Sequence, residues 1–501
     1  MIKFISVILI IAAISGMLIS CGDNKPPNSE NHNANGENDK NAEKSVGGTA
    51  AEVKTEPDLP DENFDGYMFT FLAHRYNAED WVSEDPLELV SEEQTGEPVN
   101  DAVYKRNLRI KEKYNIEIEM IPSGDERSAI RKAIGAGDDI YDAVVMFNNN
   151  VPGIVTANYL TNVEDLPYID LDKPWWDPAV NSMSIGNKNY LLSGDLLILD
   201  NEATNAILFN KDLLADLGME LPYGAAKEGK WTMDKMNGII KGAAADLDGD
   251  GIMTALEDRW GLCVFNDTLH SFLVSGGGAL AVKDENDIPY MDFASPKNLA
   301  ALDKVMNLMY NPEYVLNAQA PPPGGRDSNA FEIYTTGFGD GRILFMWIRM
   351  RVVELFRGME ANFGILPMPK ADDSQEGYRS AVNPYTGVLL GVPKSAEDLE
   401  RVSIILEALS AESRYTLQPA YYDVVLQRKY TRDDESGEML DIIFDSRVYD
   451  IGSVYSFGNV FWDFISLAAT QDKNIVSYYE KKIGAMESAI EKIVNAFRDM
   501  D

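Results

Sequence analysis

The sharpest chemical signal in the sequence is a twelve-residue acidic loop at residues 246–257. Aspartate stands at loop positions 1, 3 and 5, glycine at position 6 and glutamate at position 12. This is the spacing of an EF-hand loop, in which a hard cation takes oxygens from these positions and the glycine makes the sharp turn. A solvated acidic loop is the alternative, but the matched register favours a structural Ca²⁺ site. The predicted ligands are Asp246, Asp248, Asp250, Ile252 (through its carbonyl), Thr254 and Glu257.

A second set of residues has the chemistry to hold a polar ligand such as a sugar. Asn148, Asn149 and Asn150 directly follow an apolar run, and their amides offer paired donors and acceptors that match sugar hydroxyls. An ordinary turn is the alternative, because asparagine tolerates left-handed backbone angles. Arg349 could bind hydroxyls or a carboxylate, although surface charge is the commoner role of an arginine.

Aromatic residues in loop-like settings could stack on a sugar ring. Trp175 is followed by Trp176, and we expect one of this pair to pack beneath its loop and the other to line a cleft. Tyr385, in the segment Asn-Pro-Tyr-Thr-Gly, is a further candidate. Stacked aromatics and amides are typical of sugar sites, so these residues favour a sugar over a peptide or an amino acid.

Motifs of the common hydrolases are missing from the sequence. It contains no Gly-x-Ser-x-Gly elbow, no His-Glu-x-x-His and no glycine-rich phosphate loop. Only His74 and His270 lie in the region expected to fold, which leaves little material for histidine-activated nucleophiles. A glycosidase with paired carboxylates remains the alternative, because 81 acidic residues always offer some pair. We therefore expect a binding protein and not an enzyme.

The charge balance excludes some partners. The chain carries 44 basic and 81 acidic residues, a net charge of −37 at pH 7. Such a surface repels phosphate backbones and anionic lipid headgroups, so nucleic acid is not an expected partner.

Alternating strands and helices must position these residues. Residues 67–72 and 142–147 form apolar runs typical of buried strands, and residues 116–120 alternate as a strand with one wet face would. Between them, apolar residues recur every three to four positions, as in an amphipathic helix. The order predicts an α/β fold with a parallel sheet covered by helices.

Several local patterns resemble the extracellular solute-binding proteins of family 1, the group that includes maltose-binding protein. Each pattern is weak alone, but their order and spacing over residues 64–410 make the combination specific. The pattern of residues 419–433 departs from maltose-binding protein and leaves the ligand open. The matching segments are 104–121, Tyr-Asp and its strand at 141–147, Phe-Asn-Lys-Asp-Leu-Leu at 209–214, Trp-Thr at 231–232, and the segments 341–347, 364–369 and 387–394.

The resemblance implies a two-lobed fold of the type II periplasmic-binding-protein class, with ligand trapped by hinge closure. It implies that Trp347 matches a tryptophan of the family's cleft, with core burial as the alternative, and that Glu202 is a polar cleft contact. The expected lobes are residues 64–198 with 359–410, and residues 199–358 with 411–501. A monomer that delivers its ligand to an ABC-importer permease is the implied role. A peptide-binding protein, for which Arg349 and Glu202 could serve as anchors, and a sensor-partner lipoprotein remain alternatives.

The N-terminus has the features of a lipoprotein leader. Residues 4–19 are apolar apart from two serines and one glycine, short for a membrane span, which needs roughly twenty residues. The stretch ends in Leu-Ile-Ser-Cys, which resembles the lipobox of bacterial lipoproteins, where Cys21 receives a diacylglycerol after cleavage of residues 1–20. An uncleaved anchor is the alternative. Residues 21–63 are expected to form a flexible tether at the extracellular face of the membrane. Cys263 then has no disulfide partner.

Overall fold

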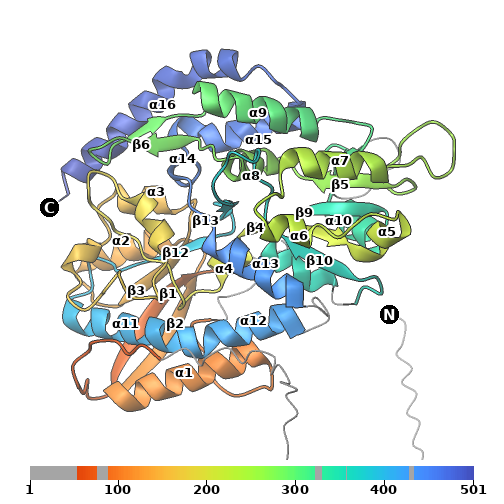
Figure 1. Cartoon of the computed structure of the whole chain (residues 1–501). Coiled ribbons are helices and arrows are strands. Elements are labelled where there is room, and N and C mark those ends of the chain that lie inside the picture. The colour runs from red at the N-terminus through yellow and green to blue at the C-terminus, as the bar shows by residue number, and fades with distance from the viewer. Residues whose placement is uncertain (1–53, 76–87, 322–329, 357, 428–433, 501) are drawn as a thin grey trace, which may run out of the picture. The chain divides into compact units, whose positions relative to one another are not determined.

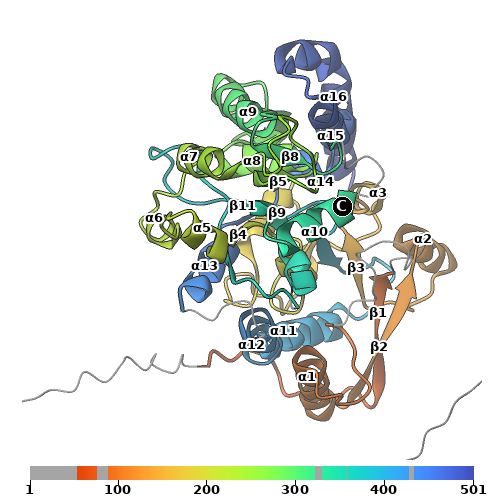
Figure 2. The same cartoon turned by 90° about the vertical axis from the view of Figure 1, so that its right-hand side faces the viewer.

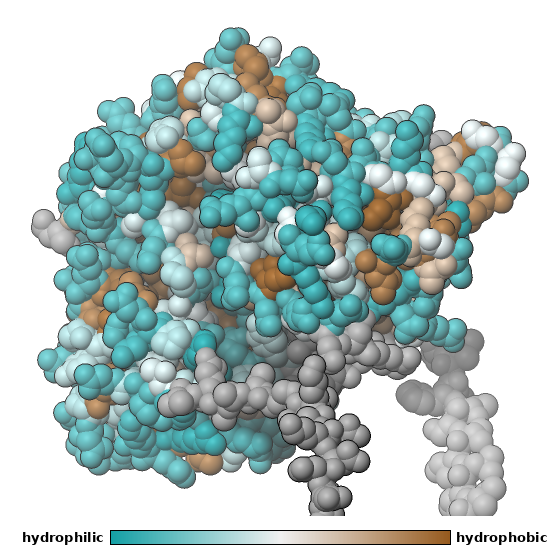
Figure 3. All heavy atoms as spheres, viewed as in Figure 1, coloured by the Kyte–Doolittle hydropathy of each residue, from teal (hydrophilic) through white to brown (hydrophobic). Residues whose placement is uncertain are grey.

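The computed structural model describes residues 54–75, 88–321, 330–356, 358–427 and 434–500 (Figure 1). The expected leader at 1–20, Cys21 and most of the expected tether lie outside the described residues. Within the described chain, no helix combines the length and the apolar character needed to cross a membrane. Hydrophilic residues cover most of the face seen in Figure 3, and the hydrophobic residues on it form small separate patches.

A four-stranded sheet forms the first lobe, in the order β12-β3-β1-β2. β1 runs parallel to β2 and β3, whereas β12 is antiparallel to β3. α1 packs on β2 and on α11. The bounds are β1 Tyr67–His74, α1 Pro98–Tyr114, β2 Ile116–Ser123, α2 Glu126–Ala136, β3 Ala143–Phe147, α3 Val151–Val155, η2 Pro178–Met183, β12 Val388–Gly391 and α11 Leu399–Tyr415.

The strand patterns seen in the sequence explain this sheet. All five residues of β3 are buried, as its continuous apolar run predicts. In β2, Ile116 and Ile118 are buried while Glu117 and Glu119 are exposed, as the alternation predicts. The predicted α/β fold with parallel strands is therefore confirmed.

A five-stranded mixed sheet forms the second lobe, in the order β10-β4-β9-β5-β8. β5 is parallel to β8 and β9, and β4 is antiparallel to β9 and β10. The bounds are α4 Leu199–Glu202, β4 Asn205–Asn210, α5 Lys211–Asp216, α6 Tyr223–Lys227, α7 Met233–Ala243, β5 Trp260–Val264, α8 Thr268–Ser275, β6 Ala281–Lys283, β7 Pro289–Met291, α9 Pro296–Met309, β8 Val315–Asn317, α10 Ala330–Gly339, β9 Ile343–Arg349, η3 Met350–Phe356 and β10 Phe363–Leu366.

The C-terminal part of the chain completes both lobes. α14, α15 and α16 lie beside α8 and the hairpin of β6 and β7 (Figures 1 and 2). β11 pairs in parallel with β13. The bounds are β11 Ser380–Ala381, α12 Leu417–Gln427, α13 Asp434–Asp445, β13 Arg447–Val448, α14 Ile451–Val454, α15 Val460–Thr470 and α16 Ile475–Arg498.

The lobe boundaries differ from the expected ones at two places. β10 pairs with β4 in the second sheet, with Ile365 opposite Leu208, so the chain does not return to the first lobe at residue 359. It returns with β12. α12 packs along α1 and α11, so the segment after residue 411 stays with the first lobe before α13 joins the second. Strand pairing and helix packing, which no local pattern encodes, decide both boundaries.

The last ten residues of the expected tether contact the folded unit. The backbone N–H of Thr55 donates a hydrogen bond to the Tyr415 hydroxyl at 2.8 Å, and Lys54 forms an ion pair with Glu412 at 3.2 Å. Leu59 packs against the core of the first lobe. The expected boundary at residue 63 therefore lies about ten residues too late in the chain.

Candidate ligand-binding site

A hollow of about 580 Å³ lies beside several of the predicted ligand residues. It lies beyond the carboxyl ends of three neighbouring strands of the second sheet: β5 leads to Phe265 and Asp267, β8 leads to Gln319, and β9 ends at Arg349. Ligands of open α/β sheets bind at such strand ends. The hollow is also lined by Ala330, Phe331, Tyr385, Phe461, Trp462 and Ile465.

Two exposed aromatic rings form one wall of this hollow. Trp462 of α15 is 40% exposed and Tyr385 is 37% exposed. Their rings meet edge to face, with centroids 5.8 Å apart and planes at 88°. The backbone N–H of Tyr385 donates to Asn383 Oδ1 at 2.9 Å, which holds the loop that carries the ring. The wall thus offers fixed, solvent-facing aromatic faces.

Polar groups face the same space. The Asp267 carboxylate accepts a hydrogen bond from Asn383 Nδ2 at 2.9 Å. Burial raises the pKa of Asp267, while the nearby Arg349 guanidinium and the Asn383 amide oppose that rise. Gln319 Oε1 accepts the backbone N–H of Asn266 at 2.8 Å, which orients its amide. Acceptor, cation and amide therefore surround a space with aromatic walls.

A second, much smaller cavity adjoins the hollow, and Arg349 lines both. Its polar lining includes Glu202 of α4 and Arg351, whose guanidinium lies 3.5 Å from the Glu202 carboxylate. Leu199, Ala203, Val352 and Thr386 complete the lining. Of the predicted ligand residues, Glu202, Arg349 and Tyr385 thus line one or both cavities.

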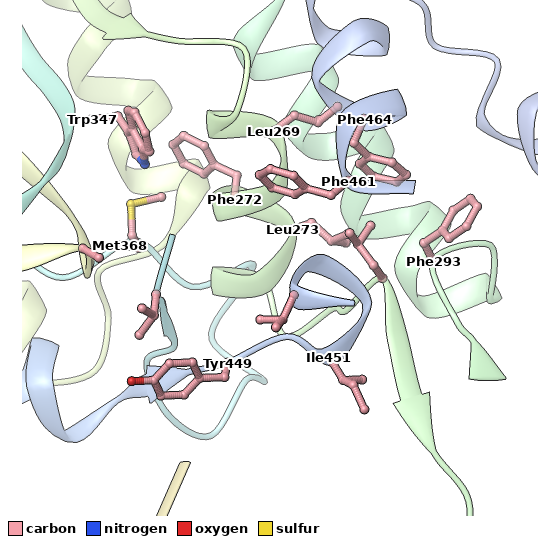
Figure 4. Packing of buried hydrophobic residues seen from close by; sticks show 14 of the residues in the cluster. Leu269, Phe272, Leu273, Phe293, Trp347, Met368, Tyr449, Ile451, Phe461 and Phe464 are labelled. Carbon is pink, nitrogen blue, oxygen red and sulfur yellow. The ribbon is translucent and has the colours of Figure 1, made fainter. Parts of the chain in front are cut away.

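Trp347 does not line either cavity. Its side chain is 2% exposed and points into the core, where Figure 4 shows it near Phe272 and Met368. Its ring packs 6.2 Å from that of Phe265, which does line the hollow. Core burial, the alternative role for Trp347, is the one the structure shows.

Trp175 and Trp176 are both buried in the core of the first lobe. Their indole nitrogens donate to the two oxygens of one carboxylate, Glu407, at 3.0 and 2.7 Å. The expectation that one of the pair lines a cleft is therefore wrong. A buried carboxylate on α11 holds the pair inside.

The three asparagines form the turn between β3 and α3. Asn148 is fully buried, and its backbone N–H donates to the Gly387 carbonyl at 2.9 Å. Asn150 donates to Glu126 at 3.2 Å, and Asn149 is exposed. None of the three lines either cavity, so the turn interpretation describes them.

The sequence analysis did not select most of the residues that line the hollow. The rule that polar groups follow strand ends, applied to β5 and β8, would have selected Asp267 and Gln319. Trp462 comes from α15, far along the chain, and the sequence analysis did not consider it. Tertiary packing of α15 against α8 brings it to the same hollow as Phe265 and Asp267.

The acidic loop has the backbone shape expected of a cation loop. The carboxylates of Asp246, Asp248 and Asp250 offer oxygens that lie within 4.8 Å of one another. The Asp246 carboxylate accepts the N–H groups of Gly249 and Gly251 at 2.7 and 2.8 Å, which lowers the pKa of Asp246. Gly251 has φ of +84°, a value that requires glycine at the turn.

The remaining predicted loop ligands lie beside this cluster. Ile252 is exposed, and the hydroxyl of Thr254 contacts Glu257 at 3.4 Å and Asp258 at 3.1 Å. The Glu257 carboxylate is not part of the three-aspartate cluster. The buried Asp258 accepts the backbone N–H groups of Leu247 and Thr254 at 2.8 and 2.6 Å, and so closes the loop.

Comparison with known proteins finds similar structures but no matching sequence. No protein-family model matches the chain, and no curated protein sequence matches it. UspC of M. tuberculosis is similar in structure at 14% identity, with a TM-score of 0.53, over 86% of this chain and 100% of UspC. A cyclo/maltodextrin-binding protein complexed with maltotetraose is similar at 14% identity, with a TM-score of 0.51, over 90% of this chain and 100% of that protein.

A third similar structure is the ABC substrate-binding protein Lmo0181 from Listeria monocytogenes, in complex with cycloalternan. It shares 14% identity, with a TM-score of 0.50, over 87% of this chain and all of its own. The expected two-lobed fold is therefore confirmed. The chain shares its fold with these sugar-bound and ABC substrate-binding proteins over most of its length.

Proposed function

We propose that this chain is an extracellular solute-binding protein that captures a sugar or oligosaccharide and delivers it to an ABC-importer permease. The observation that carries the proposal is the hollow with two exposed aromatic faces, Trp462 and Tyr385, beside Asp267 and Arg349. A sugar has an apolar ring face and hydroxyls that both donate and accept hydrogen bonds. The hollow offers partners for both.

Two of the similar structures support the sugar. Lmo0181 is in complex with cycloalternan, and the cyclo/maltodextrin-binding protein is in complex with maltotetraose. The charges in this chain's hollow point to a neutral ligand, because Arg349 lies near Asp267 and Arg351 pairs with Glu202. A ligand with a net charge would disturb one of these pairs.

A thermal-shift screen of the purified protein against oligosaccharides and short peptides tests the proposal. A ligand at 100 times its Kd stabilises the folded state by about 2.7 kcal/mol, so a true ligand raises Tm. We expect a sugar to raise it, and Trp462→Ala to remove the shift while Trp462→Phe retains most of it. Shifts with peptides alone would contradict the sugar and favour the peptide-binding alternative. A sugar shift that survives Trp462→Ala would contradict the site.

We also propose that the acidic loop binds a structural Ca²⁺. Three aspartate carboxylates, the Ile252 carbonyl, Thr254 and Glu257 are hard oxygen donors, and calcium takes six to eight of them. Glu257 must turn toward the aspartates to join them. The ion would neutralise three exposed carboxylates and fix the loop between α7 and β5.

Calcium titration followed by thermal unfolding tests the loop. Addition of Ca²⁺ to chelator-treated protein should raise Tm, and Asp246→Asn should remove the rise. Asp303→Asn, an exposed aspartate on α9, is the matched control and should leave the rise intact. A rise of equal size in Asp246→Asn would refute the site.

A lipid on Cys21 is proposed as the membrane attachment. A single acyl chain binds membranes only weakly, whereas a diacylglycerol gives stable attachment. The strongly acidic chain offers no electrostatic attraction to anionic lipid. We infer a monomer whose partner is the permease. An importer operon around the gene would support transport, and a neighbouring sensor kinase would favour the sensor-partner alternative.

A further inference from the structure

The small cavity beside the hollow has room for one hydroxyl-sized group. Its volume is about 10 Å³, on the scale on which a single water needs about 10–15 Å³. Leu199, Ala203 and Val352 supply apolar lining, and Arg349 lines both this cavity and the hollow. The cavity can admit a hydroxyl, and the apolar side chains can contact the carbon that carries it.

Thr386, which also lines this cavity, carries a hydroxyl without a partner in the described part of the chain. Thr386 is 6% exposed, and its Oγ1 atom makes no hydrogen bond within the described part of the chain. A buried polar group without a hydrogen-bond partner destabilises the folded protein. The backbone of Thr386 is fixed, because its N–H donates to the Asn383 carbonyl at 3.3 Å. Thr386 is therefore positioned to bind a group that enters the cavity.

The ion pair in the same cavity can accept an inserted group. Arg351 and Glu202 lie 3.5 Å apart, longer than the roughly 2.7–2.9 Å of a strong charge-assisted hydrogen bond. A hydroxyl can donate to the carboxylate and accept from the guanidinium at once. An incoming ammonium or carboxylate could satisfy only one of the two.

We propose that this cavity is a subsite that recognises an exocyclic hydroxyl of the ligand. A sugar held against Trp462 and Tyr385 extends its hydroxymethyl group past Arg349, with its hydroxyl on Thr386 Oγ1. The inference rests on the proposed sugar function and makes it more specific. The site selects hexose units over units that lack the hydroxymethyl group, such as pentoses.

The test compares sugars that differ only in that group. Titration calorimetry would measure wild-type protein with cellobiose, maltose and mannobiose, and with xylobiose and 6-deoxy counterparts. We expect a hexose compound to bind at least tenfold more tightly than its counterpart. Thr386→Val keeps the side-chain volume but removes the hydroxyl, and it should reduce this preference to less than threefold. Thr386→Ser should keep it.

Controls separate this inference from the parent proposal. Thr156→Val removes a hydroxyl that donates to the Pro152 carbonyl in the first lobe, away from both cavities, and should leave the preference unchanged. Equal binding of the paired sugars by wild type, or a preference that survives Thr386→Val, would overturn the subsite while sugar binding stands. Absence of binding by every sugar would reject the proposed function itself, and the subsite with it.

Discussion

Trp347 and Trp462 show how burial separates the roles of two tryptophans. Trp347 is buried and its indole nitrogen has no hydrogen-bond partner in the described chain, whereas Trp462 faces the hollow. We expect Trp347→Ala to lower the free energy of unfolding by about 3–5 kcal/mol, because it empties a core position. Trp347→Phe should cost much less, since it also removes an unsatisfied N–H. Urea unfolding measures both.

Trp462→Ala is the matched comparison. Because its ring is partly exposed, we expect a loss of ligand binding with a change in unfolding free energy below about 1 kcal/mol. If Trp462→Ala destabilised the protein as much as Trp347→Ala, the role of Trp462 would be packing and not ligand contact.

Glu407, which accepts hydrogen bonds from the two buried tryptophans of the first lobe, makes stability depend on pH. Burial raises the pKa of Glu407 to about 7, although the indole N–H groups of Trp176 and Trp175 oppose the rise. Between about pH 4.5 and pH 7 the unfolded chain has lost this proton while the folded chain keeps it. The contribution of Glu407 to stability is therefore full below about pH 4.5 and is lost as pH rises through 7.

Glu407→Gln removes this dependence. We compare the unfolding free energy of the variant with that of wild type. As pH rises from 4.5 to 7, the difference (variant minus wild type) should increase by at most about 1.4 kcal/mol per pH unit. Burial lowers the pKa of His74 to about 4, which gives stability a pH dependence of the opposite sign. Because both proteins contain His74, this contribution cancels in the difference. Glu400→Gln, on the exposed side of the same helix, should track wild type. A difference that is constant with pH would contradict the assignment.

At the scale of elements, one short strand joins parts of the chain that are far apart. Arg447 of β13 forms ion pairs with Asp177, which caps η2, at 3.1 Å and with Asp200 of α4 at 3.3 Å, and it donates to Asn201. α4 carries Glu202 into the small cavity. This buried network therefore holds the back of the cavity wall in place.

Arg447→Met should lower the unfolding free energy by about 3–5 kcal/mol near pH 8, because it leaves buried carboxylates without a cation. Burial raises the pKa of Asp200 to about 6, and Arg447 counters that rise. Without the arginine the carboxyl protonates more readily, so the loss should shrink at pH 5. Urea unfolding at both pH values measures this, with Arg498→Met on α16 as an exposed control. An equal loss at both pH values would argue against the network.

The elements also show what the sequence could and could not predict. Strands β1, β2 and β3 follow from apolar runs and alternation, because those patterns depend only on which face is buried. Trp175 was misplaced because its partner Glu407 lies 232 residues away. Glu202, Arg349 and Tyr385 reach the cavities because they lie at strand or crossing ends. Trp462 arrives through packing of α15, which no local signal encodes.

At the scale of the whole molecule, the proposed membrane attachment rests on Cys21, which lies outside the described residues. We expect Cys21→Ala protein to leave the membrane fraction and to enter the aqueous phase in detergent partition, whereas wild type enters the detergent phase. Mass spectrometry of the N-terminus would detect the diacylglycerol. Sugar binding should be unchanged in the variant, because the described unit begins at Lys54. An aqueous wild type would contradict the lipid.

The exposure of Trp462 has an optical consequence. Trp175, Trp176, Trp231, Trp260 and Trp347 are all buried, so Trp462 is the one tryptophan of the described chain that a small quencher reaches directly. A neutral quencher such as acrylamide suits a chain whose net charge of −37 repels iodide. A sugar seated in the hollow would shield Trp462 and weaken that quenching, and Trp462→Phe would abolish the effect. The protein thus carries its own fluorescent reporter of an occupied site.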